Sequence, residues 1–241
     1  MYARILLISA ICLFPSVVTA QDIAISLGDE TSLSARTLQL IALITVLSLA
    51  PGLAIMVTCF PFLVTVLSIL RQAIGLQQSP PNMLIISLAL FLTYFVMEPV
   101  FQQAWTDGLQ PLVNEAIDPQ TAFSRTLAPF RDFMAARMDG DTFAAMADLR
   151  PDTQGVPLTP NAPLSVLIPS FLLSEISRAF QIGFLVFLPF LIIDLVAAAV
   201  LMSMGMMMVP PAIVSLPFKL AFFVVADGWS LIAGSLVRSY F

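Results

Sequence analysis

The sequence predicts an all-α membrane protein built from kinked hydrophobic helical hairpins. Its 241 residues are 59% hydrophobic and only 10% charged, whereas soluble domains carry about 25% charged residues. Several apolar runs reach the roughly 20 residues that a membrane-spanning helix needs. The runs are continuous and do not alternate with polar residues, which argues against a membrane β-barrel. Because lipid accommodates only helices and closed barrels, each run is predicted to be helical.

Residues 1–20 have the features of a secretory signal peptide. Arg4 supplies a positive start, an apolar stretch follows, and small residues precede Gln21. The alternative is a short first membrane helix, but about ten apolar residues are too few to span a bilayer. Cleavage would remove Cys12 and leave Cys59 alone, so no internal disulfide is expected. Residues 21–36 then form a polar N-terminal arm.

Residues 37–101 are predicted to form a first hydrophobic helical hairpin. Pro51-Gly52 and Pro61 interrupt its opening apolar run, so we expect a kinked helix or two helical halves. Arg71 is the only charge in the turn that follows, and the positive-inside tendency places this turn at the cytoplasmic end. A further apolar helix is then expected to end at Glu98-Pro99.

Residues 102–163 are predicted to form a small acidic helical domain outside the cytoplasm. Asp118-Pro119 should begin a helix, because aspartate caps a helix start and proline favours its first turn. Pro129 is expected to kink or divide this helix. A short second helix is expected to begin at Asp141 or Thr142, before a proline-rich exit.

Residues 164–241 form the second hydrophobic region. An amphipathic stretch opens it, and two apolar runs follow that are each long enough to span a membrane. Pro189 and Pro217 are expected to interrupt these two runs.

A methionine-rich stretch lies inside this second region. Five methionines occur within residues 202–208, and Pro210-Pro211 follows directly. Methionine is flexible and polarisable, so it adapts to whatever it faces. The stretch therefore indicates a deformable apolar loop, with a Met-rich patch of core or lipid-facing helix as the alternative.

Five charged residues lie in or beside the apolar runs, namely Glu175, Arg178, Asp194, Lys219 and Asp227. A charge at bilayer depth costs roughly 2.5 kcal/mol or more, so it normally pairs or faces an internal cavity. These residues could pair within one chain or between subunits and hold a helical bundle together. The alternatives are a proton relay and a transmembrane aspartyl protease built on Asp194 and Asp227. The protease would need the two carboxylates almost in contact.

The composition excludes several kinds of site. The chain has no histidine, so it can hold neither a histidine-based catalytic triad nor a HExxH metal site. A single mature cysteine excludes a thiolate zinc cage. The net charge of −5 disfavours nucleic acid as a partner. No enzymatic activity, metal or cofactor is expected.

Two long segments carry a resemblance to a known family. Residues 172–229, which contain LIIDLVAAAVLMSMGMMMVPPAIVSLPFKLAFFVVADGW, resemble the FliP/SctR family of bacterial flagellar and type III export gates. Residues 47–97, LSLAPGLAIMVTCFPFLVTVLSILRQAIGLQQSPPNMLIISLALFLTYFVM, resemble it as well and come in the family's order. The signal peptide and Pro210-Pro211, where injectisome members tend to have Ser-Pro, point to the flagellar branch.

The resemblance implies a subunit of the export gate that passes unfolded flagellar subunits across the inner membrane. It implies that five copies assemble with FliQ and FliR into a closed cone, largely on the periplasmic side, with FlhA, FlhB and membrane lipid as further partners. Met206, Met207 and Met208 would line the narrowest point as a gasket, with Gly205, Pro210 and Pro211 as the hinge of that loop. Glu175 and Lys219 match family positions for charges that pair at subunit interfaces, and Asp194 matches too.

Overall fold

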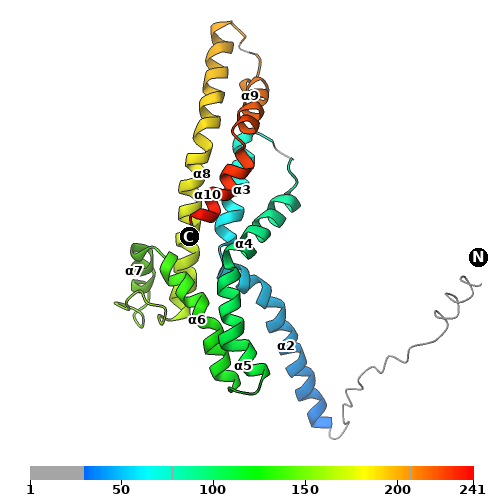
Figure 1. Cartoon of the computed structure of the whole chain (residues 1–241), viewed down its shortest axis with the longest axis vertical. Coiled ribbons are helices and arrows are strands. Elements are labelled where there is room, and N and C mark those ends of the chain that lie inside the picture. The colour runs from blue at the N-terminus through cyan, green and yellow to red at the C-terminus, as the bar shows by residue number, and fades with distance from the viewer. Residues whose placement is uncertain (1–29, 77–78, 207) are drawn as a thin grey trace, which may run out of the picture. The chain divides into compact units, whose positions relative to one another are not determined.

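The computed structural model describes residues 30–76, 79–206 and 208–241, and these residues form helices and connecting turns without a strand (Figure 1). The predicted all-α class is confirmed. The chain divides into two units, Met1–Ser48 and Leu49–Phe241. The predicted signal peptide lies outside the described residues.

Helix α2 (Glu30–Met56) and helix α3 (Phe60–Ile74) correspond to the first apolar run. The chain is divided just before Pro61, which lies in the first turn of α3, where proline is well tolerated. Pro51-Gly52 does not divide the run, because it lies inside α2. Residues 30–36 of the predicted polar arm form the start of α2.

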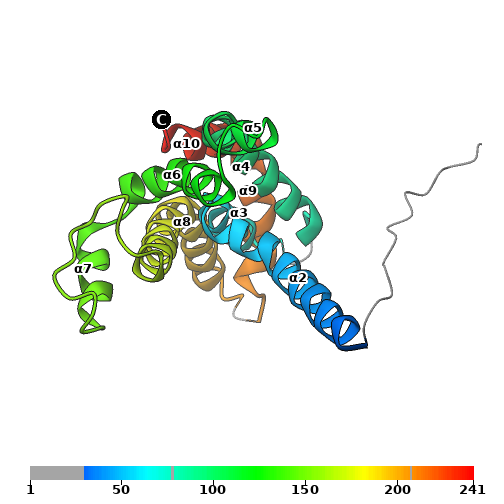
Figure 2. The same ribbon diagram turned by 90° about the horizontal axis from the view of Figure 1, so that it is seen from below.

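Helix α3 is the centre of the larger hydrophobic core. Its buried residues pack chiefly against α8 (Leu164–Ser203) and α4 (Asn82–Ala104). The helix ends at Gly75, whose φ of 88° lies in the left-handed region that glycine adopts most easily. The view in Figure 2 shows α3 between α8 and α4. The side chains that α3 buries are Phe62, Leu63, Val66, Leu67, Leu70, Ala73 and Ile74.

Helix α4 does not end at Glu98-Pro99 as predicted. It runs through Pro99 to Ala104 and continues as a π-helical segment, η1 (Trp105–Leu109), and a short α5 (Gln110–Val113). Helix α4 packs against α3 and α6 (Pro119–Arg137), and neighbouring helices can satisfy backbone groups that a proline leaves free. The residues around Pro99 do not by themselves indicate that these helices pack there.

Helix α6 and helix α7 (Gly140–Asp148) build the acidic part of the chain. Asp118 and Asp139 cap them by accepting hydrogen bonds from the backbone N–H of Thr121 and Thr142. Hydrogen bonds from the same threonines lower the pKa of both carboxyl groups. The predicted start at Asp118-Pro119 is confirmed, and α7 begins just before the predicted position.

Pro129 lies inside α6 without dividing it, contrary to one of the two outcomes predicted there. A second hydrophobic core joins α6 and α7 to the first turns of α8. Its members are Met134, Met138, Phe143, Ala147, Ala162, Val166, Leu167 and Phe171.

The second hydrophobic region is one 40-residue helix, α8, followed by α9 (Pro211–Val225) and α10 (Gly228–Arg238). Pro189 and Pro217 lie inside helices and interrupt neither run. The break falls instead at Asp227, whose φ of 47° is left-handed, and α9 and α10 meet there at a bend of 61°. The described residues include three helices long and apolar enough to cross a membrane, or four if α9 and α10 count as one span.

Candidate functional site

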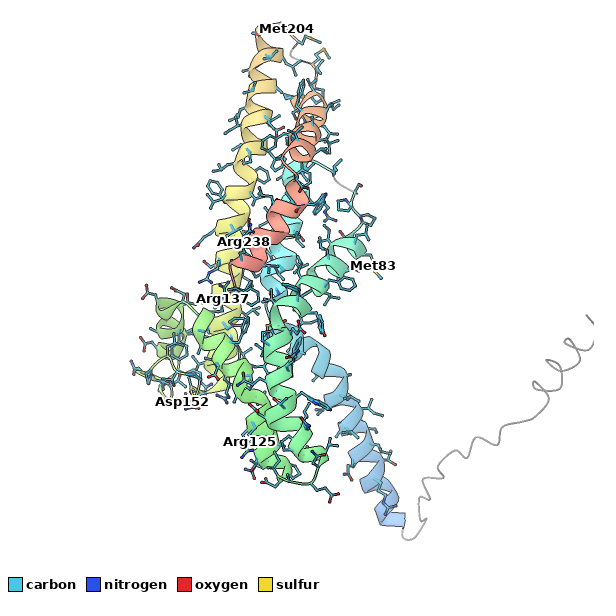
Figure 3. The ribbon with its side chains drawn as sticks, in the orientation of Figure 1. Met83, Arg125, Arg137, Asp152, Met204 and Arg238 are labelled. Carbon is cyan, nitrogen blue, oxygen red and sulfur yellow. The ribbon has the colours of Figure 1, made fainter. Side chains whose placement is uncertain are left out.

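The methionine-rich stretch forms the tip of the hairpin between α8 and α9. Figure 3 shows Met204 at the end of the larger unit farthest from Arg125 in α6. Gly205 has a φ of 74°, which lets the chain turn out of α8. Met204, Met206 and Met208 are 67%, 43% and 97% exposed. Met207 lies outside the described residues.

An apolar groove of about 540 Å³ lies directly beside this tip, between the second half of α8 and the first half of α9. Both Met204 and Met206 contribute to its wall, so the loop and the groove form one continuous apolar surface. The other residues that line it are Ile192, Ile193, Val196, Ala197, Val200, Leu201, Val214 and Phe218.

The outer faces of α8 and α9 are also apolar and exposed. Leu195 is 61% exposed, Ile213 is 68% exposed and Val224 is 75% exposed. A monomeric soluble protein rarely exposes a contiguous apolar surface of this extent, so these faces indicate contact with lipid or with other protein subunits.

Lys219 of α9 ties its own helix to α3 and α8. Its ammonium donates to Asp194 Oδ2 of α8 at 2.6 Å and to the carbonyl of Ala73 in α3 at 3.1 Å. The carbonyl lies in the last turn of α3, where the helix dipole favours a cation. Ser215 completes the arrangement by donating to Asp194 Oδ1. Lys219 is 5% exposed, whereas the side chain of Asp194 is 33% exposed.

Because Lys219 and Asp194 differ in exposure, we expect the two substitutions to lower the free energy of unfolding by different amounts. Asp194→Ala should lower the free energy of unfolding by about 1–2 kcal/mol, because it leaves a buried ammonium with a carbonyl as its remaining partner. The value is discounted from a fully buried pair, since the side chain of Asp194 is 33% exposed. Lys219→Met should cost less than about 1 kcal/mol, because Asp194 keeps the hydrogen bond from Ser215 and is only partly buried. Thermal unfolding of the purified variants measures which of the two loses more stability. A larger loss for Lys219→Met than for Asp194→Ala would contradict the prediction.

Glu175 lies in a second charged cluster, at the boundary of the two hydrophobic cores. It is fully buried on α8, and its Oε1 accepts from Arg137 Nε at 3.3 Å. Its Oε2 accepts from the hydroxyl of Tyr240. Burial, followed by the charge of Glu175 and this hydrogen bond, raises the pKa of Tyr240. Within one chain, Glu175 therefore pairs with Arg137 and with neither Lys219 nor Arg178.

The remaining two predicted charges take no part in the hydrogen bonds of either cluster among the described residues. Arg178 is half-buried on α8, and Asp227 is exposed at the bend between α9 and α10. Neither takes part in an ion pair among the described residues. The same residues hold no group of three or more Cys, Asp or Glu side chains placed to bind a metal ion.

Three contributors to these clusters were not predicted from the sequence. Arg137 looks like an ordinary cation at the end of a polar helix, and Tyr240 and Ser215 belong to no motif. Their partners are distant in the chain: Arg137 and Glu175 are 38 residues apart, and Glu175 and Tyr240 are 65 apart. No local signal in the sequence could have identified them.

Comparisons with known proteins agree over nearly the whole chain. A family model described as the FliP family matches residues 43–236. The flagellar biosynthetic protein FliP of Caulobacter vibrioides is 51% identical over 233 residues, which cover 96% of this chain and 87% of that protein. The protein of the same name from Agrobacterium fabrum is 46% identical over 97% of both chains. The one from Bacillus subtilis is 43% identical over 89% of this chain and 96% of its own.

Proposed function

Since the chain belongs to the FliP family of flagellar biosynthetic proteins, we propose that it is a pore-forming subunit of the flagellar protein export gate. The family assignment makes it an inner-membrane component of flagellar export and a structural protein, not an enzyme. The proposal goes further. Several copies surround a channel through which unfolded flagellar subunits pass, and Met206, Met207 and Met208 close that channel as a gasket.

The observation that carries this proposal is the position of the methionine loop at an exposed apolar tip. A ring of thioethers from several copies can exclude water and ions, because an apolar constriction gates by dewetting. The same side chains can rearrange around an unfolded polypeptide of any sequence, since methionine is unbranched and flexible. Gly205, Pro210 and Pro211 limit the loop at both ends, which suits them to act as its hinge.

The exposed faces of α8 and α9 support an assembly of several subunits. In the proposed gate, five copies contact one another and FliQ and FliR through these faces, and FlhA and FlhB act as further partners. Residues 102–163 form the periplasmic domain of each subunit. The apolar surface left after assembly contacts membrane lipid.

The pairing of Glu175 and Asp194 favours a structural role over proton relay. Glu175 already accepts from Arg137 and Tyr240, and Asp194 from Lys219 and Ser215. Each carboxylate thus already has a cation and a hydroxyl as partners, an arrangement that fits a fixed contact between helices. In the proposed gate these groups, with Arg178 and Asp227 near the surface, keep helices and subunits in register.

The test is the triple variant Met206→Ala, Met207→Ala and Met208→Ala. Alanine cannot fill the gap that the thioethers leave, so cells carrying the variant should leak ions and grow more slowly while the export complex still assembles. Ion flux across the inner membrane and the mass of the purified complex measure both parts. Met83→Ala serves as the control, because Met83 is 77% exposed on α4 and lies outside the loop. If the triple variant assembles and its ion flux is no larger than that of the control, the proposed gasket is wrong.

A further inference from the structure

We propose that Tyr240 is a positioning residue that, together with Arg137 and Glu175, clasps α6 to α8. We call these three residues the clasp. The inference concerns the single subunit and does not depend on the proposed channel.

The polar contacts of the clasp join three separate parts of the chain. Arg137 at the end of α6 donates through Nε to Glu175 on α8 and through Nη1 to the carbonyl of Ser239 at 2.6 Å. Tyr240 donates its hydroxyl to the other oxygen of Glu175. Each of the three side chains thus contacts both of the others, because the guanidinium carbon of Arg137 also lies 3.9 Å from the centroid of the Tyr240 ring.

The ring of Tyr240 makes a second set of contacts, which are apolar. It stacks on Phe133 of α6 with centroids 6.1 Å apart, and it meets Phe62 of α3 edge-on at 5.5 Å. Phe133 in turn lies 5.8 Å from Phe171 of α8. A single side chain therefore contacts the helix of the acidic part, the central helix of the larger core and, through Phe133, the second core.

The position of this cluster explains what the clasp would do. Phe133 packs against both hydrophobic cores, so the clasp lies where the two cores meet. Arg137 is the last residue of α6, and α7 begins three residues later. Without the clasp, the end of α6 and all of α7 would be held by the second core and by Asp139, whose backbone N–H donates to Ser174 of α8. We infer that the segment after α10 fixes the orientation of α6 and α7 on α8.

The residue next to Tyr240 provides a matched control. Phe241 is a large aromatic side chain, but it is 79% exposed. A general effect of altering this end of α10 should appear in Phe241→Ala as well, whereas an effect of the clasp should appear in Tyr240 variants alone.

The experiment measures amide hydrogen exchange on the full chain in its purified complex for Tyr240→Ala, Tyr240→Phe and Phe241→Ala. Tyr240→Ala is expected to speed exchange over residues 131–148 by about tenfold or more, because local opening follows the loss of buried contacts. Tyr240→Phe keeps the ring and loses the bond to Glu175, so it should give a smaller increase over the same residues. Residues 192–203 of α8, which are remote from the clasp in sequence, should be unchanged.

Two results would overturn the clasp. One is equal exchange over residues 131–148 in Tyr240→Ala and Phe241→Ala. The other is acceleration of the same size along the whole of α8, which would show general destabilisation and no local positioning. If Tyr240→Ala fails to fold, the comparison rests on Tyr240→Phe against Phe241→Ala, and no difference between these two would reject the proposal. Ion leak through the assembled complex is a separate readout, so failure of the gasket leaves this test intact.

Discussion

Replacing Gly108 with alanine is expected to lower the free energy of unfolding by about 3 kcal/mol, the upper part of the usual range for overpacking. A Cβ atom at this position would lie 2.1 Å from Thr126 Oγ1, 2.7 Å from the Thr126 backbone nitrogen and 2.9 Å from its Cα. Two of these three atoms belong to the backbone of α6, which cannot move away by a rotamer change. The added methyl group must therefore push η1 and α6 apart.

Thermal unfolding of the purified protein in detergent measures this effect. A loss of about 3 kcal/mol in a domain of this size corresponds to a fall in Tm of roughly 6–12 °C. Thr126→Ala should not rescue the variant, because it removes the hydroxyl and leaves the two backbone contacts. Gly140→Ala is the control, since a Cβ there meets nothing within 4 Å.

Gly183 provides the contrasting case in the same protein. A Cβ on this residue of α8 would lie 2.4 Å from Cδ1 of Ile69 in α3, and the three nearest atoms all belong to that side chain. Gly183→Ala alone should destabilise the packing of α3 on α8, but Ile69→Ala should relieve it. Rescue of Gly108→Ala by Thr126→Ala, or failure of Ile69→Ala to rescue Gly183→Ala, would contradict this account of the two contacts.

Glu175→Ala is expected to cost about 3–5 kcal/mol, the usual effect of removing one partner from a buried ion pair. The side chain of Arg137 is 14% exposed, so its guanidinium would remain largely desolvated without its carboxylate. One nitrogen of that guanidinium, Nη2, already lacks a hydrogen-bond partner among the described residues. The hydroxyl of Tyr240 would lose its acceptor as well.

Glu175→Gln separates the charge from the hydrogen bonds. The amide oxygen can still accept from Tyr240, so this variant should lose less stability than Glu175→Ala. Glu98→Gln is the matched control, because Glu98 is exposed and accepts from Gln102 of its own helix. Thermal unfolding of the three variants gives the comparison, and a Glu175→Ala variant as stable as Glu98→Gln would show that the pair contributes nothing.

The prolines show which features of the helices the neighbouring residues do not determine. A proline inside an isolated helix costs about 3 kcal/mol, which is why breaks were predicted at several of these positions. In the structure, Pro99, Pro129, Pro189 and Pro217 all lie inside helices. Apolar helices in a membrane protein tolerate proline where neighbouring groups can satisfy the freed backbone. Pro119 lies in the first turn of α6 as predicted, and the predicted interruption at Pro61 falls at the start of α3, where the missing N–H has no partner to lose.

The sequence by itself determined the helical class, the family, the position of the methionine stretch and the helix start at Asp118-Pro119. These features depend on composition, on contiguous residues and on capping, which act within a few residues of the chain. Tertiary structure alone decided that Glu175 meets Arg137 and Tyr240 and that Lys219 meets Asp194 and Ala73. The physical reason is distance along the chain: the side chains that donate to Asp194 and Glu175 lie at least 21 residues away from them, and only the packing of whole helices brings such groups within reach.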